Sequence, residues 1–170
     1  RLLTLLDADA PGAEPNPLAA AVALLLLCPQ IPMLFMGEES GSREPFLYFT
    51  SHHEQLAEAV REGRRREFGA FAGFGGVAGE LPDPNARSTF AASSPYPAGR
   101  VDPALNAWQA YYQRLLHIRH KAIVPTLPAT RAIGAQAIGA GAVAARWRQG
   151  DGRVLLLAVN LGTQPATLAP

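Results

Sequence analysis

Residues 32–40 of the chain are PMLFMGEES, an uninterrupted apolar run followed by a glycine and two acids. The apolar part, Met33–Met36, is short and continuous and lies between a proline and a glycine. Such a run is typical of a parallel strand covered on both faces, because a half-exposed strand alternates apolar and polar residues. We therefore predict a buried strand that delivers Glu38 and Glu39 from its carboxyl end.

The segment before this strand carries the signals of a helix. Asn16 followed by Pro17 is typical of an N-cap and a first helical residue, and apolar residues continue through Leu27. A helix, a short link and a buried strand make an α/β unit. In barrels and doubly wound sheets of this class, the carboxyl ends of the strands carry the functional site.

Two groups of side chains near the strand end are candidate substrate-binding residues. Glu38 and Glu39 follow the strand directly, and Phe46, Tyr48 and Phe49 come shortly afterwards. An acid at the end of a buried strand can face a functional site, and the aromatic rings can stack on a sugar ring. The alternatives stay open: the acids could instead pair with nearby arginines, and the aromatic residues could pack their loop onto the body of the protein.

The composition excludes several classes of partner and site. The 170 residues are 48% hydrophobic and carry a net charge of +1, which provides no field for a nucleic acid or an anionic membrane. The longest apolar run is about half of what a membrane span needs. Cys28 is the single cysteine, and the histidines lack metal-site spacing, so we predict a soluble, cytoplasmic protein with no metal and no cofactor.

The rest of the sequence predicts two more helices and then a change of class. EQLAEAVREGRRREF, residues 54–68, and a stripe through Trp108, Tyr112 and Leu115 have helical character. From Pro125 onward, alternating strand runs surround a turn at residues 150–152. The predicted fold class is α/β followed by β, with domains at 1–124 and 125–170, and the second domain holds too few strands to complete a sandwich.

Four stretches of the chain, in this order, resemble the late part of the malto-oligosyltrehalose trehalohydrolases, within the α-amylase-like glycoside hydrolase family. They are LLLLCPQIPMLFMGEE, the region ending in AVREGRRREF, LPDPNARSTF and WQAYYQRLLHIRHKA. The resemblance implies that Met33–Met36 is the eighth strand of a (β/α)8 barrel and that the helix near residues 105–121 is the eighth barrel helix. The region after residue 125 would then begin a C-terminal antiparallel β-sandwich.

The same resemblance implies a retaining glycosidase acting on malto-oligosyltrehalose or a malto-oligosaccharide. Glu38 and Glu39 would shape sugar subsites, whereas the catalytic carboxylates of the family lie on earlier strands that this chain does not contain. We therefore expect no catalytic residue in this chain and no activity from it alone. Two alternatives are a glucan branching enzyme of the same fold and a non-catalytic carbohydrate-binding fragment. Ser40 departs from the family, which usually has a large aromatic residue there.

Overall fold

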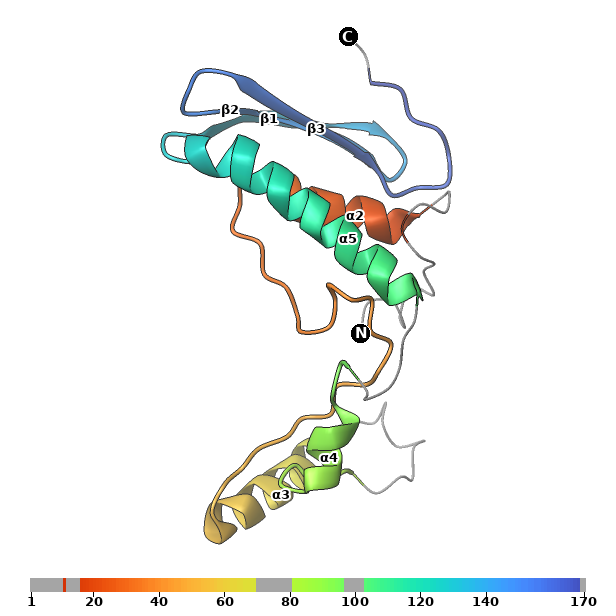
Figure 1. Ribbon diagram of the computed structural model, residues 1–170, viewed down its shortest axis with the longest axis vertical. Helices are drawn as coiled ribbons and strands as arrows, with labels where there is room; N and C mark the ends of the chain where they lie inside the picture. Colours follow the sequence, from red (N-terminus) through yellow and green to blue (C-terminus); the bar gives the residue numbers. More distant parts are fainter. Residues whose placement is uncertain (1–10, 12–15, 70–80, 97–102, 169–170) are drawn as a thin grey trace. The chain divides into compact units, whose positions relative to one another are not determined.

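The computed structural model describes residue 11 and residues 16–69, 81–96 and 103–168 (Figure 1). Apart from its first residue, the chain divides into two compact units, which are described separately. Unit 1 spans residues 43–100, and unit 2 combines residues 2–42 with residues 101–170. The predicted domain boundary after residue 124 stays a prediction.

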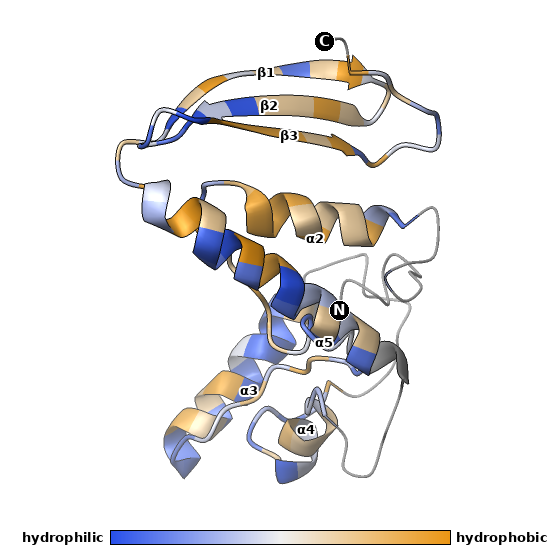
Figure 2. Ribbon diagram, turned by 45° about the horizontal axis from the view of Figure 1, so that its top comes forward, coloured by the Kyte–Doolittle hydropathy of each residue, from blue (hydrophilic) through white to orange (hydrophobic). Residues whose placement is uncertain are grey.

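The first described helix of unit 2 is α2 (Pro17–Leu27), and it begins as the sequence predicts. The side chain of Asn16 accepts a hydrogen bond of 2.8 Å from the backbone N–H of Ala19, and Pro17 occupies the first turn. The helix ends where Cys28 turns to an extended conformation, just before Pro29. Local chemistry therefore explains both ends of the helix. Between them, the helix carries apolar residues along most of its length (Figure 2).

The second long helix of unit 2 is α5 (Pro103–Ile118), which continues into a π-helical turn, η1 (Arg119–Ile123), and a short 3-10 turn, η2 (Val124–Thr126). Helices α2 and α5 pack together, and their buried side chains form one apolar cluster. That cluster consists of Leu18, Ala19, Val22 and Leu26 from α2 and Trp108, Tyr112 and Leu115 from α5. The predicted stripe through Trp108, Tyr112 and Leu115 is thus confirmed as core.

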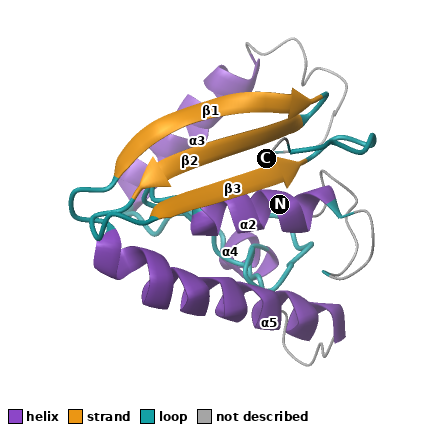
Figure 3. Ribbon diagram, turned by 90° about the horizontal axis from the view of Figure 1, so that it is seen from above, coloured by secondary structure: helices purple, strands orange, loops and turns teal. Residues whose placement is uncertain are grey.

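Three antiparallel strands complete unit 2: β1 (Arg131–Gly139), β2 (Ala142–Arg148) and β3 (Val154–Asn160), lying side by side in that order (Figure 3). Strand β3 contacts α2. The predicted turn at residues 150–152 joins β2 to β3. Gly150 is required there, because a Cβ atom at this position would lie 2.1 Å from the carbonyl oxygen of Pro128. An antiparallel β segment after residue 125 is therefore confirmed, whereas a sandwich is not shown.

The faces of the sheet follow the predicted alternation only in part. Trp147 is buried opposite Leu155, and its neighbours Arg146 and Arg148 are exposed, as alternation requires. Ala144 shares a face with the two arginines but is only 3% exposed. The sheet face that carries the two arginines is therefore exposed only at its arginine end.

Unit 1 contains α3 (Glu54–Gly69) and the short α4 (Arg87–Ala92). The buried hydroxyl of Ser93 joins the chain before α3 to the end of α4: it accepts a hydrogen bond of 3.0 Å from Leu47 N–H and lies 2.9 Å from Leu47 O. A backbone bond of 2.8 Å from Thr50 N–H to Pro84 O makes a second connection. These contacts link segments that are more than thirty residues apart in sequence.

The predicted buried strand at Met33–Met36 is wrong as local structure. These residues form no strand, and Met33 is 88% exposed, Leu34 36%, Phe35 42% and Met36 50%. A parallel strand exists only where neighbouring strands accept its hydrogen bonds and cover its faces. No strand of the described residues pairs with this segment, so the apolar run lies outside the sheet, and its last residue, Met36, already lies in a turn.

Candidate substrate-binding site

A compact turn at residues 35–42 holds the two acidic candidates. Its backbone is closed by three hydrogen bonds: Glu38 N–H to Phe35 O at 3.0 Å, Gly41 N–H to Glu38 O at 3.0 Å and Ser42 N–H to Gly37 O at 2.9 Å. Gly37 has a φ of 87°, which few other residues adopt at low cost. The glycine before the acids therefore reverses the chain after the apolar run.

The carboxylates of Glu38 and Glu39 both fold back onto this turn. One oxygen of Glu38 accepts a hydrogen bond of 3.3 Å from Phe35 N–H, and one oxygen of Glu39 accepts a bond of 2.9 Å from Gly37 N–H. Both side chains are half-buried. These bonds orient the two acids, and an ionised carboxylate has about four acceptor positions in all. Such an arrangement suits the binding of hydroxyl groups.

Tyr112 belongs to the surroundings of these acids, which the sequence alone did not indicate. Its side chain is only 3% exposed, and burial raises the pKa of its phenol. The negative charges of Glu38 and Glu39 raise the pKa of Tyr112 further. The phenol is therefore neutral over the ordinary pH range and can act as a hydrogen-bond donor near the turn.

Ser40 is completely buried in the same turn. Its exposed fraction is 0%, and its hydroxyl donates a hydrogen bond of 3.1 Å to the carbonyl oxygen of Gly37. The family that the sequence resembles usually has a large aromatic residue at this position. The side chain at this position instead packs within the turn, so a large ring would require the turn to change shape.

Arg119 positions the backbone that leads toward the acidic turn. Its guanidinium donates hydrogen bonds to the carbonyl oxygens of Leu26 at 2.9 Å, Cys28 at 2.5 Å and Gln30 at 2.8 Å. The residue is 7% exposed. The helix dipole explains why a cation lies near the end of this helix. It does not predict the three carbonyl partners of Arg119.

In unit 1, the aromatic candidates are engaged with other rings and with a cation. The ring centroids of Phe46 and Phe49 are 5.7 Å apart, and Phe49 meets Phe90 edge-on at 5.0 Å. The guanidinium of Arg64 lies 4.4 Å from the centre of the Tyr48 ring. Phe46 and Tyr48 nevertheless keep 39% and 44% of their surface exposed. Ring surface is therefore available on the same loop that the packing holds in place.

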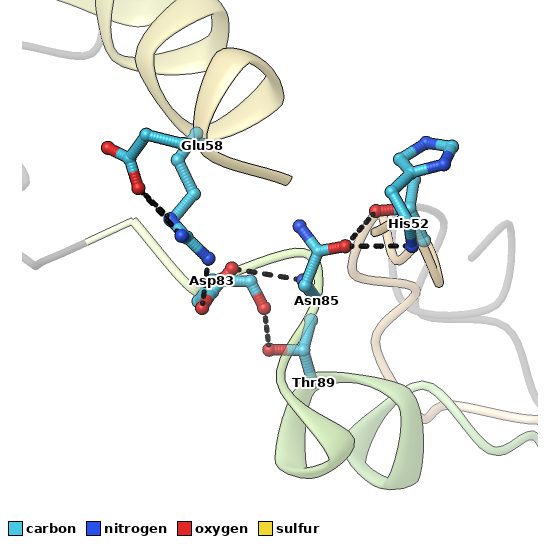
Figure 4. A network of polar contacts seen from close by, with 7 residues as sticks. His52, Glu58, Asp83, Asn85 and Thr89 are labelled. Atoms are coloured by element: carbon cyan, nitrogen blue, oxygen red, sulfur yellow. Dashed lines mark hydrogen bonds and ion pairs between the residues drawn. The ribbon is translucent and has the colours of Figure 1, made fainter. Parts of the chain in front are cut away.

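A polar network around Asp83 and Asn85 orders the second half of unit 1 (Figure 4). Arg61 bonds Glu58 at 2.6 Å and Asp83 at 3.2 Å, so one arginine of the charged helix does reach a distant carboxylate. The side-chain oxygen of Asn85 accepts hydrogen bonds from Thr50 and from His52 N–H. Because a backbone N–H only donates, this contact fixes the orientation of the amide. The Nδ2 atom of Asn85 is then buried without a hydrogen-bond partner.

Among the described residues, no group of three or more histidine, cysteine, aspartate or glutamate side chains could hold a metal ion. Within residues 16–69, 81–96 and 103–168, no helix has both the length and the apolar character to cross a membrane.

Comparisons with known proteins identify relatives. A family model described as "Domain of unknown function (DUF3459)" matches residues 130–170. A malto-oligosyltrehalose trehalohydrolase of Deinococcus radiodurans is 47% identical over 68 residues, which are 40% of this chain and 11% of the relative. A trehalohydrolase of Arthrobacter ramosus is 53% identical over 77 residues, which are 45% of this chain and 13% of the relative. A trehalohydrolase of Saccharolobus solfataricus is 56% identical over 50 residues, which are 29% of this chain and 9% of the relative.

The chain resembles malto-oligosyltrehalose trehalohydrolases. The resemblance predicted from sequence is thereby confirmed. A crystal structure described as a "Putative alpha Amylase" from Salmonella typhimurium matches all of this chain, with a TM-score of 0.74 and 39% sequence identity. That match covers 27% of the solved chain, and the matched segments span about a tenth of the curated trehalohydrolases. In the solved structure, the region that matches this chain is thus part of a larger chain.

Proposed function

We propose that this chain is part of a glycoside hydrolase of the α-amylase family that cleaves the α-1,4 bond next to the terminal trehalose of malto-oligosyltrehalose and releases trehalose. The observation that carries the proposal is the identity of 46–56% to several trehalohydrolases. The match of the whole chain to an α-amylase-like structure supports the same family.

In this proposal the chain contributes binding and not bond cleavage. A retaining glycosidase needs a carboxylate nucleophile and a second carboxyl group as acid and base, placed about 5 Å apart on either side of the scissile bond. Glu38 and Glu39 are instead hydrogen-bonded to their own turn. We assign Glu38 and Glu39 of unit 2 to sugar hydroxyls in a subsite. Separately, we assign the exposed rings of Phe46 and Tyr48 in unit 1 as candidate stacking surfaces. The isolated chain is then catalytically inactive.

The test is a digest of malto-oligosyltrehalose by the longer protein that carries this chain, with trehalose measured by chromatography. Glu38→Gln and Glu39→Gln should raise KM by about 10-fold, the loss of one charged hydrogen bond to the substrate. Glu62→Gln is the matched control, because Glu62 is exposed on α3 and pairs with Arg66 at 3.8 Å. The isolated chain should release nothing.

Four outcomes would overturn parts of this proposal. Digests without trehalose but with new α-1,6 linkages would assign a branching enzyme. Hydrolysis by the isolated chain would show that its own acids are catalytic. Unchanged KM values in both glutamate variants would remove Glu38 and Glu39 from the substrate-binding site. Binding of malto-oligosaccharide without any hydrolysis by the longer protein would assign a carbohydrate-binding role.

A further inference from the structure

Among the described residues, the hydrogen-bond partners of the Arg119 side chain are backbone carbonyl groups. Its guanidinium bonds the carbonyl oxygens of three alternate residues, Leu26, Cys28 and Gln30, at 2.5–2.9 Å. The first of these carbonyls lies in the last turn of α2, and the other two lie beyond the helix end. One side chain therefore binds both the end of the helix and the link that follows it.

The chemistry of this contact requires an arginine. The guanidinium is buried, and among the described residues its partners are carbonyl oxygens and no carboxylate. The carbonyl end of a helix carries partial negative charge, which compensates a cation there. The planar guanidinium presents five N–H donors in a fixed arrangement, whereas a lysine ammonium is a compact charge that cannot span the same three acceptors.

The helix that carries Arg119 is widened at this residue. The N–H of Val124 bonds the carbonyl oxygen of Arg119, five residues earlier, and residues 119–123 form a π-helical turn. Single π-helical turns cost helix stability and occur frequently at functional sites. The change from α to π geometry therefore begins at the residue whose side chain holds the link after α2.

The link leads directly to the acidic turn. From Gln30, residues 31–35 run without regular structure or a described strand beside them and enter the closed turn that holds Glu38 and Glu39. The turn is fixed internally by its own hydrogen bonds. Its direction relative to α2 depends on how the chain leaves the helix, and the bonds from Arg119 fix the backbone at that point.

We propose that Arg119 is a positioning residue for the acidic turn: it fixes the backbone of residues 26–30 and thereby aims Glu38 and Glu39 at the substrate. The aiming part rests on the function proposed above, and the fixing part does not. Arg119 itself touches no substrate in this scheme.

The fixing part is tested in the 170-residue chain through Cys28, its only cysteine. Ellman's reagent is used to modify the thiol in the wild type, in Arg119→Lys and in Arg119→Met, at several urea concentrations below the unfolding transition. We expect both variants to react about 10-fold faster, at rates nearly independent of urea, because the link opens locally. Arg114→Lys is the control, since Arg114 is an exposed residue of the same helix.

Two results would overturn the fixing part. One is a thiol reaction rate in Arg119→Met equal to that of the wild type. The other is a faster reaction whose urea dependence equals that of global unfolding, because Arg119 would then stabilise the whole fold without holding the link.

The aiming part is tested by the kinetics of the longer protein on malto-oligosyltrehalose. Arg119→Lys should raise KM about 10-fold with kcat within about 2-fold, as expected when ground-state binding is lost. A wild-type KM in the Arg119→Lys variant would overturn the aiming part of the proposal. If the wild-type protein releases no trehalose, the proposed function fails, whereas the thiol experiment still decides whether Arg119 fixes the link.

Discussion

The phenol of Tyr111 donates a hydrogen bond of 2.8 Å to the backbone carbonyl oxygen of Ala19, which joins α5 to α2 across 92 residues of sequence. Tyr111→Phe keeps the ring and removes this bond. We expect the free energy of unfolding to fall by about 0.5–1.5 kcal/mol, measured by urea denaturation followed by tryptophan fluorescence. Tyr48→Phe is the control, because Tyr48 contacts Arg64 through its ring. Equal midpoints for wild type and Tyr111→Phe would show that the bond contributes nothing.

Two adjacent leucines of α2 differ sharply in burial: Leu26 is 0% exposed and Leu25 is 39% exposed. Leu26→Ala should lower the free energy of unfolding by about 2–5 kcal/mol, because it removes buried methyl groups and leaves a cavity between α2 and α5. Leu25→Ala makes the same chemical change outside the core and should cost less than about 1 kcal/mol. Similar losses in the two variants, in thermal or urea unfolding, would contradict the packing described here.

The buried phenol of Tyr112 predicts a loss of stability at high pH. Burial, and then the charges of Glu38 and Glu39, raise its pKa above the ordinary value of about 10. The folded state therefore keeps a proton that the unfolded state releases, so this contribution to stability is complete below about pH 10 and decreases above it.

The free energy of unfolding should decrease above that pH by up to about 1.4 kcal/mol per pH unit from Tyr112. In Tyr112→Phe, the free energy of unfolding should decrease less steeply with pH between about pH 10 and 11.5. Urea unfolding at each pH measures this dependence. Burial also raises the pKa of Tyr111, so some slope should persist in this variant. Tyr111→Phe should retain the contribution of Tyr112. A wild-type slope in Tyr112→Phe would contradict the assignment.

The hydroxyl of Ser93 predicts a matched pair of variants in unit 1. Ser93 is 2% exposed, and its hydroxyl oxygen accepts a hydrogen bond from the Leu47 N–H. The hydroxyl of Ser94 instead bonds the backbone of nearby Tyr96. Ser93→Ala leaves the N–H of Leu47 without this acceptor and should lower the free energy of unfolding by about 1–3 kcal/mol. Ser94→Ala should cost less than about 0.5 kcal/mol. Helix unfolding followed by circular dichroism measures both, and equal losses would contradict this role of Ser93.

The elements that the sequence predicted correctly are those whose causes are local. Asn16 and Pro17 start α2 through a cap bond and a preset φ, and neither depends on distant residues. The turn at residues 150–152 is marked by its own Gly-Asp-Gly sequence between two strand runs. Local chemistry of this kind can be predicted from the order of residues alone.

The features that the sequence did not predict depend on partners far away in the chain. Met33–Met36 has the composition of a strand, but a strand also needs neighbours, and none is present among the described residues. Arg119 finds backbone carbonyls some ninety residues away, and a carbonyl has no signature in a sequence. The apolar spacing around Tyr112 indicated a core position and gave no sign of the two charged acids nearby.

The distribution of tryptophan in the chain supplies a built-in reporter. Both tryptophans, Trp108 and Trp147, belong to unit 2, one in the α2–α5 core and one in the sheet, and both are buried. Residues 43–100 contain none, although they include the sixteen-residue helix α3. Intrinsic fluorescence therefore follows the unfolding of unit 2, whereas helical circular dichroism follows both units. The difference between the two curves measures how far unit 1 unfolds independently.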